Sequence, residues 1–138
     1  MSVNPNERKA ALRHAIVIED EMVVRVLLEE ALAEIGFTSS AFDNAAAALT
    51  HLGDVNGECS LIIADQGLPG GIQGTDLIRL ARETWPDIPS ILTSGYHVDD
   101  QIIPPSTIYL HKPYTLEELE LTIAAVLQAD TGDSDQAR

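Results

Sequence analysis

The sequence predicts an α/β fold in which one parallel sheet carries helices on both faces. Short apolar runs rich in β-branched residues alternate with amphipathic helical patterns, and this alternation repeats five times along the chain. The runs at residues 15–18 and 61–64 contain no polar residue. Such uninterrupted runs are typical of strands that are buried on both faces of a parallel sheet.

Five segments have the properties of strands, because they are short, bounded by turn residues and, apart from 38–42, mainly apolar. They are residues 15–18, 38–42, 61–64, 89–93 and 108–110. The segment at 38–42 is the weakest of the five. The segment at 89–93 follows a Pro-Asp-Ile-Pro turn, which favours a chain reversal just before it.

Helical patterns lie between these strands and after the last one. They span residues 23–35, 44–52, 74–85 and 115–128. Gly36 is a suitable stop for the first helix. Asp43 is expected to cap the second helix and Gly53 to end it. Thr115 and Glu118 have the spacing of a capping box, which predicts the start of the last helix.

The stretch between Thr93 and Lys112 is short, and Pro104 and Pro105 interrupt it. Proline removes a backbone donor and breaks a helix interior. A helix between the fourth and fifth strands must therefore be short or irregular.

Length and composition indicate one domain with one core. The chain has 138 residues and a hydrophobic fraction of 45%. We expect a polar N-terminal segment at 1–13, a single domain at 14–128 and a flexible tail at 129–138. The N-terminal segment lacks the apolar core of a signal peptide, and no apolar run is long enough to cross a bilayer. With Cys59 as the single cysteine, these features predict a cytoplasmic protein.

The formal net charge of −14 argues against several classes of partner. Attraction to a phosphate backbone or to an anionic surface needs positive charge, so we expect no nucleic acid and no membrane as direct partners. Most of the acidity is explained by solubility. A local cluster of carboxylates could in addition hold a cation.

Reactive side chains lie at or just after the C-terminal ends of four of the five predicted strands, and these ends meet at one edge of a parallel sheet. They are Glu19 and Asp20, then Asp65, then Thr93 and Ser94, then His111 and Lys112. Three carboxylates should converge there, and like charges at close range repel unless a cation lies among them. A small set of oxygen ligands suits Mg²⁺. A carboxylate nucleophile, a divalent metal, a lysine and a hydroxyl together form a site for phosphoryl transfer to Asp65.

Each of these residues also has an ordinary structural explanation. Acidic residues after a strand often stabilise the N-terminus of the next helix. A single Asp or Thr at a strand end is common in turns, and Lys112-Pro113 is typical of a loop. This explanation is much weaker for the whole set, in which each residue lies at the proper strand end. The set is Glu19, Asp20, Asp65, Thr93 and Lys112.

Five segments of the chain resemble the receiver domain of bacterial two-component response regulators, over about residues 14–127. They are Ile16-Val17-Ile18-Glu19-Asp20-Glu21, Leu61-Ile62-Ile63-Ala64-Asp65, Leu68-Pro69, Ile91-Leu92-Thr93-Ser94-Gly95-Tyr96 and Tyr109-Leu110-His111-Lys112-Pro113. The resemblance implies a doubly wound, flavodoxin-like sheet of five parallel strands in the order 2-1-3-4-5.

The resemblance also implies a role for each site residue. Asp65 would be the phosphoacceptor, and Asp20 rather than Glu19 the direct metal ligand of the acidic pair. The implied Mg²⁺ ligands are Glu19, Asp20, Asp65 and the backbone carbonyl of Gly67. The implied phosphate-binding and switch residues are Thr93, Ser94, Lys112 and Tyr109. The Lys112–Pro113 peptide bond is expected to be cis.

By this resemblance the protein is a single-domain response regulator of a phosphorelay, which switches its partner binding and acts as an enzyme only in its own phosphorylation and dephosphorylation. Its partners would be a histidine kinase, a histidine phosphotransfer protein, or both, and a downstream target protein, while homodimer formation stays open. The loop at 69–74 is one residue longer than the commonest receiver pattern. This loop and the short fourth helix resemble receivers of hybrid histidine kinases and some stand-alone receivers.

Two alternative functions differ from this interpretation. A phosphatase of the haloacid-dehalogenase type also uses an Asp nucleophile after a strand, but its second Asp would fall on Gly67. A receiver-like scaffold that does not need phosphate would lack at least one site residue, and none is missing here.

Overall fold

The computed structural model describes residues 13–136, so residues 1–12 of the predicted N-terminal segment and 137–138 of the predicted tail lie outside the described residues. All five predicted strands are present in one parallel sheet. They are β1 (His14–Ile18), β2 (Thr38–Phe42), β3 (Leu61–Asp65), β4 (Ser90–Ser94) and β5 (Thr107–His111). Their order in the sheet is β2-β1-β3-β4-β5, which confirms the predicted order 2-1-3-4-5.

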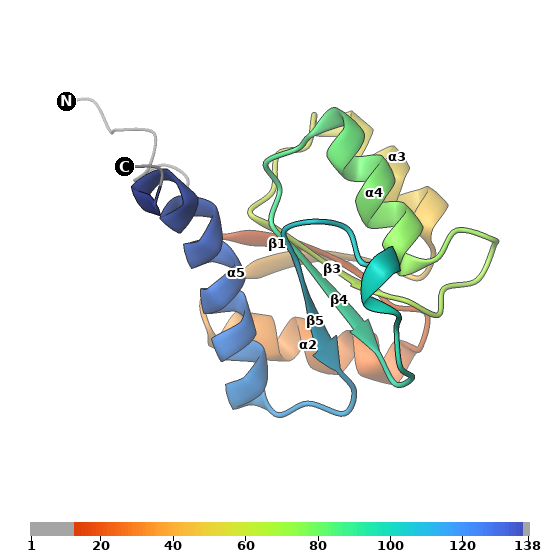
Figure 1. Cartoon of the computed structure of the whole chain (residues 1–138). Coiled ribbons are helices and arrows are strands. Elements are labelled where there is room, and N and C mark those ends of the chain that lie inside the picture. Colours follow the sequence, from red (N-terminus) through yellow and green to blue (C-terminus); the bar gives the residue numbers. More distant parts are fainter. Residues whose placement is uncertain (1–12, 137–138) are drawn as a thin grey trace.

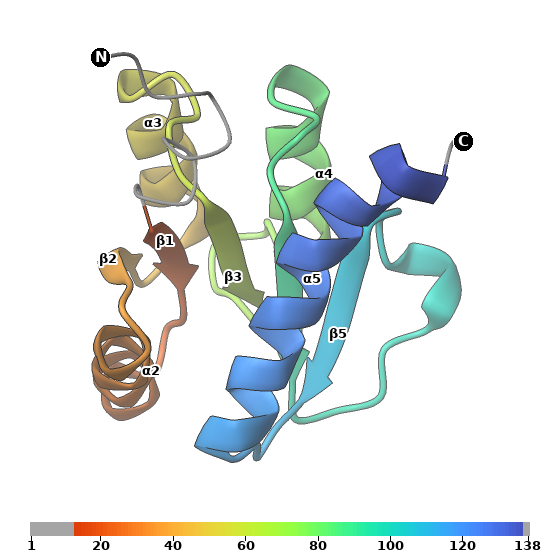
Figure 2. The ribbon, with the colours of Figure 1, turned by 90° about the vertical axis from the view of Figure 1, so that its left-hand side faces the viewer.

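Four α-helices cover the two faces of this sheet (Figures 1 and 2). They are α2 (Met22–Glu34), α3 (Ala45–Asp54), α4 (Gly74–Thr84) and α5 (Leu116–Gln136). Alternate residues of each strand point to opposite faces. Ile16 and Ile18 therefore pack in the core beneath α3 and α4, whereas Ala15 and Val17 pack beneath α2 and α5. Within residues 13–136, no helix is both long and apolar enough to span a bilayer.

A short 3₁₀ helix, η1 (Asp100–Ile102), replaces a regular helix between β4 and β5. This confirms the expectation of a short or irregular fourth helix. The Asp99 side chain accepts a hydrogen bond from the Gln101 backbone N–H at 3.0 Å. Arg79 on α4 donates to the carbonyl of Ile102 at 3.2 Å and so ties η1 to the neighbouring helix.

The boundaries of α3 differ from the prediction. Asn44, not Asp43, is the N-cap, because its backbone is extended and its side chain accepts a hydrogen bond from the Ala47 N–H at 2.8 Å. The Asp43 carboxylate instead accepts a bond from the Asn44 amide at 2.7 Å. Gly53 was expected to end the helix but lies inside it, and the C-cap is Val55.

The start of α5 agrees with the sequence, whereas its end does not. The predicted capping box is present, with the Glu118 carboxylate 2.8 Å from the Thr115 N–H and the Thr115 hydroxyl 3.0 Å from the Glu118 N–H. The helix extends to Gln136, past the expected end at residue 128. The predicted flexibility of the tail at 129–138 stays a prediction.

Candidate functional site

Asp65 is the last residue of β3, the central strand of the sheet. Strand β3 lies between β1 and β4, and in the register of β3 with β4 Asp65 is paired with Thr93. Glu19 directly follows β1 on the other side. After β1 the chain goes on to β2, at one edge of the sheet. After β3 it goes on to β4 and then β5, toward the opposite edge. Ligand sites of open parallel sheets form at such a reversal of strand order.

Three carboxylates converge at this point, as the sequence predicts. Glu19, Asp20 and Asp65 each place a carboxylate oxygen within 4.8 Å of the other two. Glu19 and Asp65 are only 3% and 7% exposed, whereas Asp20 is exposed. Burial raises the pKa of Glu19 above its ordinary value, because a charged carboxylate loses its hydration there. A compact set of anionic oxygens fits a small divalent cation such as Mg²⁺.

Lys112 lies inside the carboxylate cluster. Its ammonium group donates to Glu19 Oε1 at 2.9 Å and to Asp65 Oδ1 at 3.1 Å. Burial disfavours the charge on Lys112, but the hydrogen bonds to Glu19 and Asp65 outweigh it and raise the pKa of Lys112 above its ordinary value. The lysine compensates one of the three negative charges, and the remaining charge matches a divalent cation.

Thr93 joins the site and Ser94 does not. The Thr93 hydroxyl is buried and donates to Asp65 Oδ1 at 3.3 Å. The Ser94 hydroxyl donates to the Tyr96 carbonyl at 2.9 Å and accepts from the Tyr96 N–H at 3.0 Å. Successive residues of a strand point to opposite faces, so the two hydroxyls separate. Both of these hydrogen bonds of the Ser94 hydroxyl thus go to Tyr96 rather than to Asp65. The expected phosphate-binding role of Ser94 stays a prediction.

The Tyr109 hydroxyl is held by the loop that follows β4. It lies 2.8 Å from the Tyr96 carbonyl and 3.3 Å from the Ser94 carbonyl. His111 Nδ1 lies 3.0 Å from the same hydroxyl, and the two rings meet edge to face. His111 is exposed, as an outward-facing strand residue should be. Its bond to Tyr109 was not predicted, although a separation of two residues on a strand places both side chains on one face.

The backbone of the site bears on two expectations that the resemblance implies. The Lys112–Pro113 peptide bond is cis, as expected. Gly67 lies beside Asp65, because a Cβ added at Gly67 would be 3.7 Å from Asp65 Oδ2. The role of its carbonyl as a metal ligand stays a prediction.

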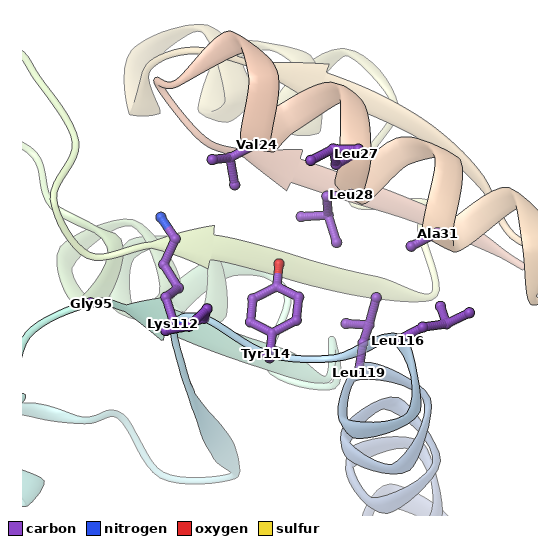
Figure 3. A pocket seen from close by; sticks show the side chains of 10 residues that line it. Val24, Leu27, Leu28, Ala31, Gly95, Lys112, Tyr114, Leu116 and Leu119 are labelled. Carbon is purple, nitrogen blue, oxygen red and sulfur yellow. The ribbon is translucent and has the colours of Figure 1, made fainter.

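A cleft of about 560 Å³ between α2 and α5 lies next to the site (Figure 3). Its wall is apolar, with Val24, Leu27 and Leu28 on one side, and the Lys112 side chain forms one end. Tyr114 projects its hydroxyl into the space between the helices (Figure 3). Burial raises the pKa of Tyr114, so this hydroxyl stays neutral at ordinary pH.

Comparison with known proteins identifies one family. The sequence matches the family described as the response regulator receiver domain over residues 15–124. The sensor kinase CckA of Brucella abortus (strain 2308) is 31% identical over 117 residues, which are 82% of this chain and 12% of CckA. The response regulator receiver protein CpdR of the same strain is 29% identical over 122 residues, which are 86% of this chain and 99% of CpdR.

A solved structure with the same fold is the response regulator receiver protein of Sinorhizobium medicae WSM419. Its TM-score is 0.78 at 24% identity, with 85% of this chain and 95% of that chain covered. The chain spans about half or less of the length of the first curated relatives that it matches.

Proposed function

The chain belongs to the response regulator receiver domain family, and from this premise we propose that Asp65 accepts a phosphoryl group from the phosphohistidine of a histidine kinase or a histidine phosphotransfer protein. One observation carries the proposal. The buried carboxylate of Asp65 receives hydrogen bonds from both Lys112 and Thr93 and lies in a cluster with two further carboxylates.

In the proposed reaction an Asp65 oxygen attacks the phosphorus, the new P–O bond forms, and the P–N bond to the donor imidazole breaks. Lys112 and Thr93 already contact Asp65 Oδ1, so both donors are available to the oxygens of the transferred group. Donors fixed in place before the reaction stabilise developing charge without reorganisation. The chain thus provides the nucleophile and part of the charge compensation.

We propose that Glu19, Asp20, Asp65 and the Gly67 carbonyl hold Mg²⁺. When bound, the ion supplies positive charge that offsets the charge of the phosphoryl oxygens. Both carboxylate oxygens of Glu19 are already engaged, one by Lys112 at 2.9 Å and the other by the Glu21 N–H at 3.2 Å. Asp20 is exposed beside them. This contrast supports Asp20 as the direct ligand and Glu19 as an indirect one.

We further propose that phosphorylation changes partner binding through Thr93 and Tyr109. Thr93 would move its hydroxyl bond from Asp65 to a phosphoryl oxygen, and the loop after β4 would follow. Because the Tyr109 hydroxyl is bound to this loop, a shift of the loop changes which Tyr109 conformation is favoured. The surface that changes with this loop would then be the one that a partner protein recognises.

The test is uptake of phosphate from a small acyl phosphate donor, measured by intact-protein mass spectrometry at neutral pH. Wild type should gain one phosphoryl group in MgCl₂ and none in EDTA. Asp65→Asn should gain none, because the amide keeps the shape but cannot act as the nucleophile. Asp87→Asn is the matched control. Asp87 is an exposed residue in the turn before β4, and Thr93 lies near the opposite end of that strand.

Several outcomes would contradict the proposal. Uptake by Asp65→Asn at the wild-type rate would show that another residue is the acceptor. Equal uptake in EDTA and MgCl₂ would remove the metal from the proposal. Continuous release of inorganic phosphate at many turnovers for each protein molecule would indicate a phosphatase instead.

A further inference from the structure

Gln66, the residue directly after Asp65, connects three parts of the site through its backbone. Its N–H donates to the Thr93 carbonyl at 2.8 Å, which continues the pairing of β3 with β4 beyond Asp65. Its carbonyl accepts from the Leu68 N–H at 3.0 Å and from the Gly74 N–H at 3.2 Å. Both ends of the loop that joins β3 to α4 are therefore hydrogen-bonded to the Gln66 carbonyl.

The Gln66 side chain completes this connection. Its Oε1 accepts from the Thr75 N–H at 2.9 Å, and its Nε2 donates to Gln73 Oε1 at 3.1 Å. The first backbone N–H groups of a helix have no partner within the helix. Gln66 satisfies one of them at α4, while Gln73 and Asp76 form the capping box of the same helix. The start of α4 is thus bound to the end of β3 by a side chain from outside the helix.

The contact between α4 and β3 leaves no free space. A Cβ added at Gly74 would lie 2.5 Å from the Asp65 carbonyl oxygen and 2.8 Å from Leu92 Cδ1. The first turn of α4 therefore rests directly on the backbone of Asp65. Between these fixed points lies a loop that contains Gly67 and two glycines with positive φ, Gly70 and Gly71. Glycine leaves a loop with many conformations, so its geometry depends on how its two ends are held.

We propose that Gln66 is a positioning residue for the Asp65 site. Its amide fixes the start of α4 to the end of β3, and this holds the Gly67 carbonyl in place beside the Asp65 carboxylate. The inference rests on the proposed function in that Asp65 and Gly67 are taken as ligands of Mg²⁺. Residues that orient ligands without touching the metal commonly change metal affinity by an order of magnitude or more.

The experiment compares Gln66→Met with Asn44→Ala in the full chain. Gln66→Met keeps the length of the side chain but removes both hydrogen bonds. Asn44→Ala removes a side-chain cap from α3, whose bond to the Ala47 N–H measures 2.8 Å, and removes none of the hydrogen bonds of Gln66 or of the Asp65 carboxylate. Mg²⁺ affinity is measured by NMR titration with MgCl₂, and amide hydrogen exchange at Leu68 reports on the loop.

Gln66→Met should bind Mg²⁺ about tenfold more weakly than wild type and should exchange the Leu68 amide faster. Asn44→Ala should match wild type in both measurements. Equal Mg²⁺ affinity in Gln66→Met and wild type would overturn the proposal, as would an equal loss in Asn44→Ala or an absence of Mg²⁺ binding by wild type.

A second variant covers the case in which Gln66→Met does not fold. Gln66→Asn keeps the amide but is one methylene too short to reach both Thr75 and Gln73, and the same loss of Mg²⁺ affinity is expected. Phosphate uptake is measured in parallel. If wild type binds Mg²⁺ but takes up no phosphate, the proposed function fails, and the comparison of Mg²⁺ affinities still decides the role of Gln66.

Discussion

Two glycines, one two residues after Asp65 and one two residues after Thr93, bear on how long a phosphoryl group would persist on Asp65. Gly67 and Gly95 offer no side chain that could orient an attacking water molecule. The open space at both positions favours solvent access, which acts in the opposite direction. Because orienting a nucleophile contributes orders of magnitude and water is already abundant, we expect the missing side chains to dominate and the phosphorylated protein to be fairly long-lived.

Replacing Gly67 by Asn should therefore speed the loss of phosphate from Asp65. The structure leaves room for the change, because a Cβ at Gly67 meets nothing closer than Asp65 Oδ2 at 3.7 Å. The measurement follows the phosphorylated fraction over time in MgCl₂ buffer after removal of the donor. A rate that falls or stays the same would count against this explanation. Gly95→Ala, where a Cβ has nothing within 4 Å, controls for bulk without a polar group.

At this scale the sequence predicted which residues meet but not how each is oriented. Four site residues were predictable, because each lies at or just after the C-terminal end of a parallel strand and such ends share one edge. They are Glu19, Asp65, Thr93 and Lys112. The turn of Ser94 toward Tyr96 was missed, since it depends on which face each strand-end residue occupies. The capping role of Gln66 was also missed, because a side-chain bond to a helix nine residues later has no short-range pattern.

Strand β5 contains a buried hydroxyl that has no hydrogen-bond partner in the described part of the chain. Among the described residues, Thr107 Oγ1 is the buried side-chain oxygen without a hydrogen-bond partner. A buried polar group without a partner loses its hydration and receives no compensation. Thr107→Val keeps the shape and the β-branched character of the strand residue. It should raise the free energy of unfolding by about 1 kcal/mol, as measured by urea denaturation. A lower midpoint at an unchanged slope would contradict this.

The edge strand β2 is bound to β1 by a histidine, which makes the pairing sensitive to acid. His14 Nδ1 lies 2.6 Å from Thr38 Oγ1, and Nε2 lies 2.9 Å from Ser40 Oγ. Burial, and then the charge of nearby His51, lowers the pKa of His14 below its ordinary value of 6.5. The unfolded chain binds this proton more tightly than the folded chain. The stabilising contribution is therefore complete above pH 6.5 and is lost as the pH falls toward the folded-state pKa.

His14→Gln should remove this part of the pH dependence. The measurement is the free energy of unfolding by urea in EDTA buffer, at one pH above 6.5 and one pH unit below it, for wild type and the variant. Wild type should lose more stability than His14→Gln over this interval. His97→Gln, at an exposed loop position, should behave as wild type. An identical pH dependence in wild type and His14→Gln would show that His14 remains as easily protonated in the folded chain.

Secondary structure was predictable where local patterns are strong, and less so where two local signals compete. Apolar runs specified β1 and β3 most clearly and β2 least, since β2 contains two serines. Pro104 and Pro105 specified the lack of a regular fourth helix. At α3, Asp43 and Asn44 are both good caps, and the choice depends on which residue has extended backbone. Gly53 has open space around it and is tolerated within α3. Neither the choice of N-cap nor the place of Gly53 inside α3 can be predicted from composition alone.

At the scale of the whole molecule, the carboxylate cluster should couple Mg²⁺ binding to stability. The folded chain brings three carboxylates together and the unfolded chain does not, so the proposed Mg²⁺ should bind mainly to the folded form. The stability should rise by RT ln(1 + [L]/Kd), which is about 2.7 kcal/mol when Mg²⁺ is present at one hundred times its Kd. Urea denaturation in EDTA and in MgCl₂ measures this difference.

Asp20→Ala should abolish most of the stabilisation by Mg²⁺, and Glu19→Ala should abolish less, because Glu19 is engaged by Lys112 and the Glu21 N–H. Asp87→Asn serves as the control for a general effect of one fewer carboxylate. Equal stabilisation of wild type and Asp20→Ala by Mg²⁺ would exclude Asp20 as a ligand.

The central claim is that Asp65 is the acceptor of the phosphoryl group, and its most direct test locates the modified residue. Borohydride reduces an aspartyl phosphate to homoserine and leaves free aspartate unchanged. Wild-type protein treated with an acyl phosphate donor in MgCl₂ is reduced, digested and sequenced by mass spectrometry. Homoserine is expected at position 65 after treatment in MgCl₂, and no homoserine is expected after treatment in EDTA. Homoserine at position 20, or phosphate on the intact protein with aspartate unchanged at position 65, would contradict it.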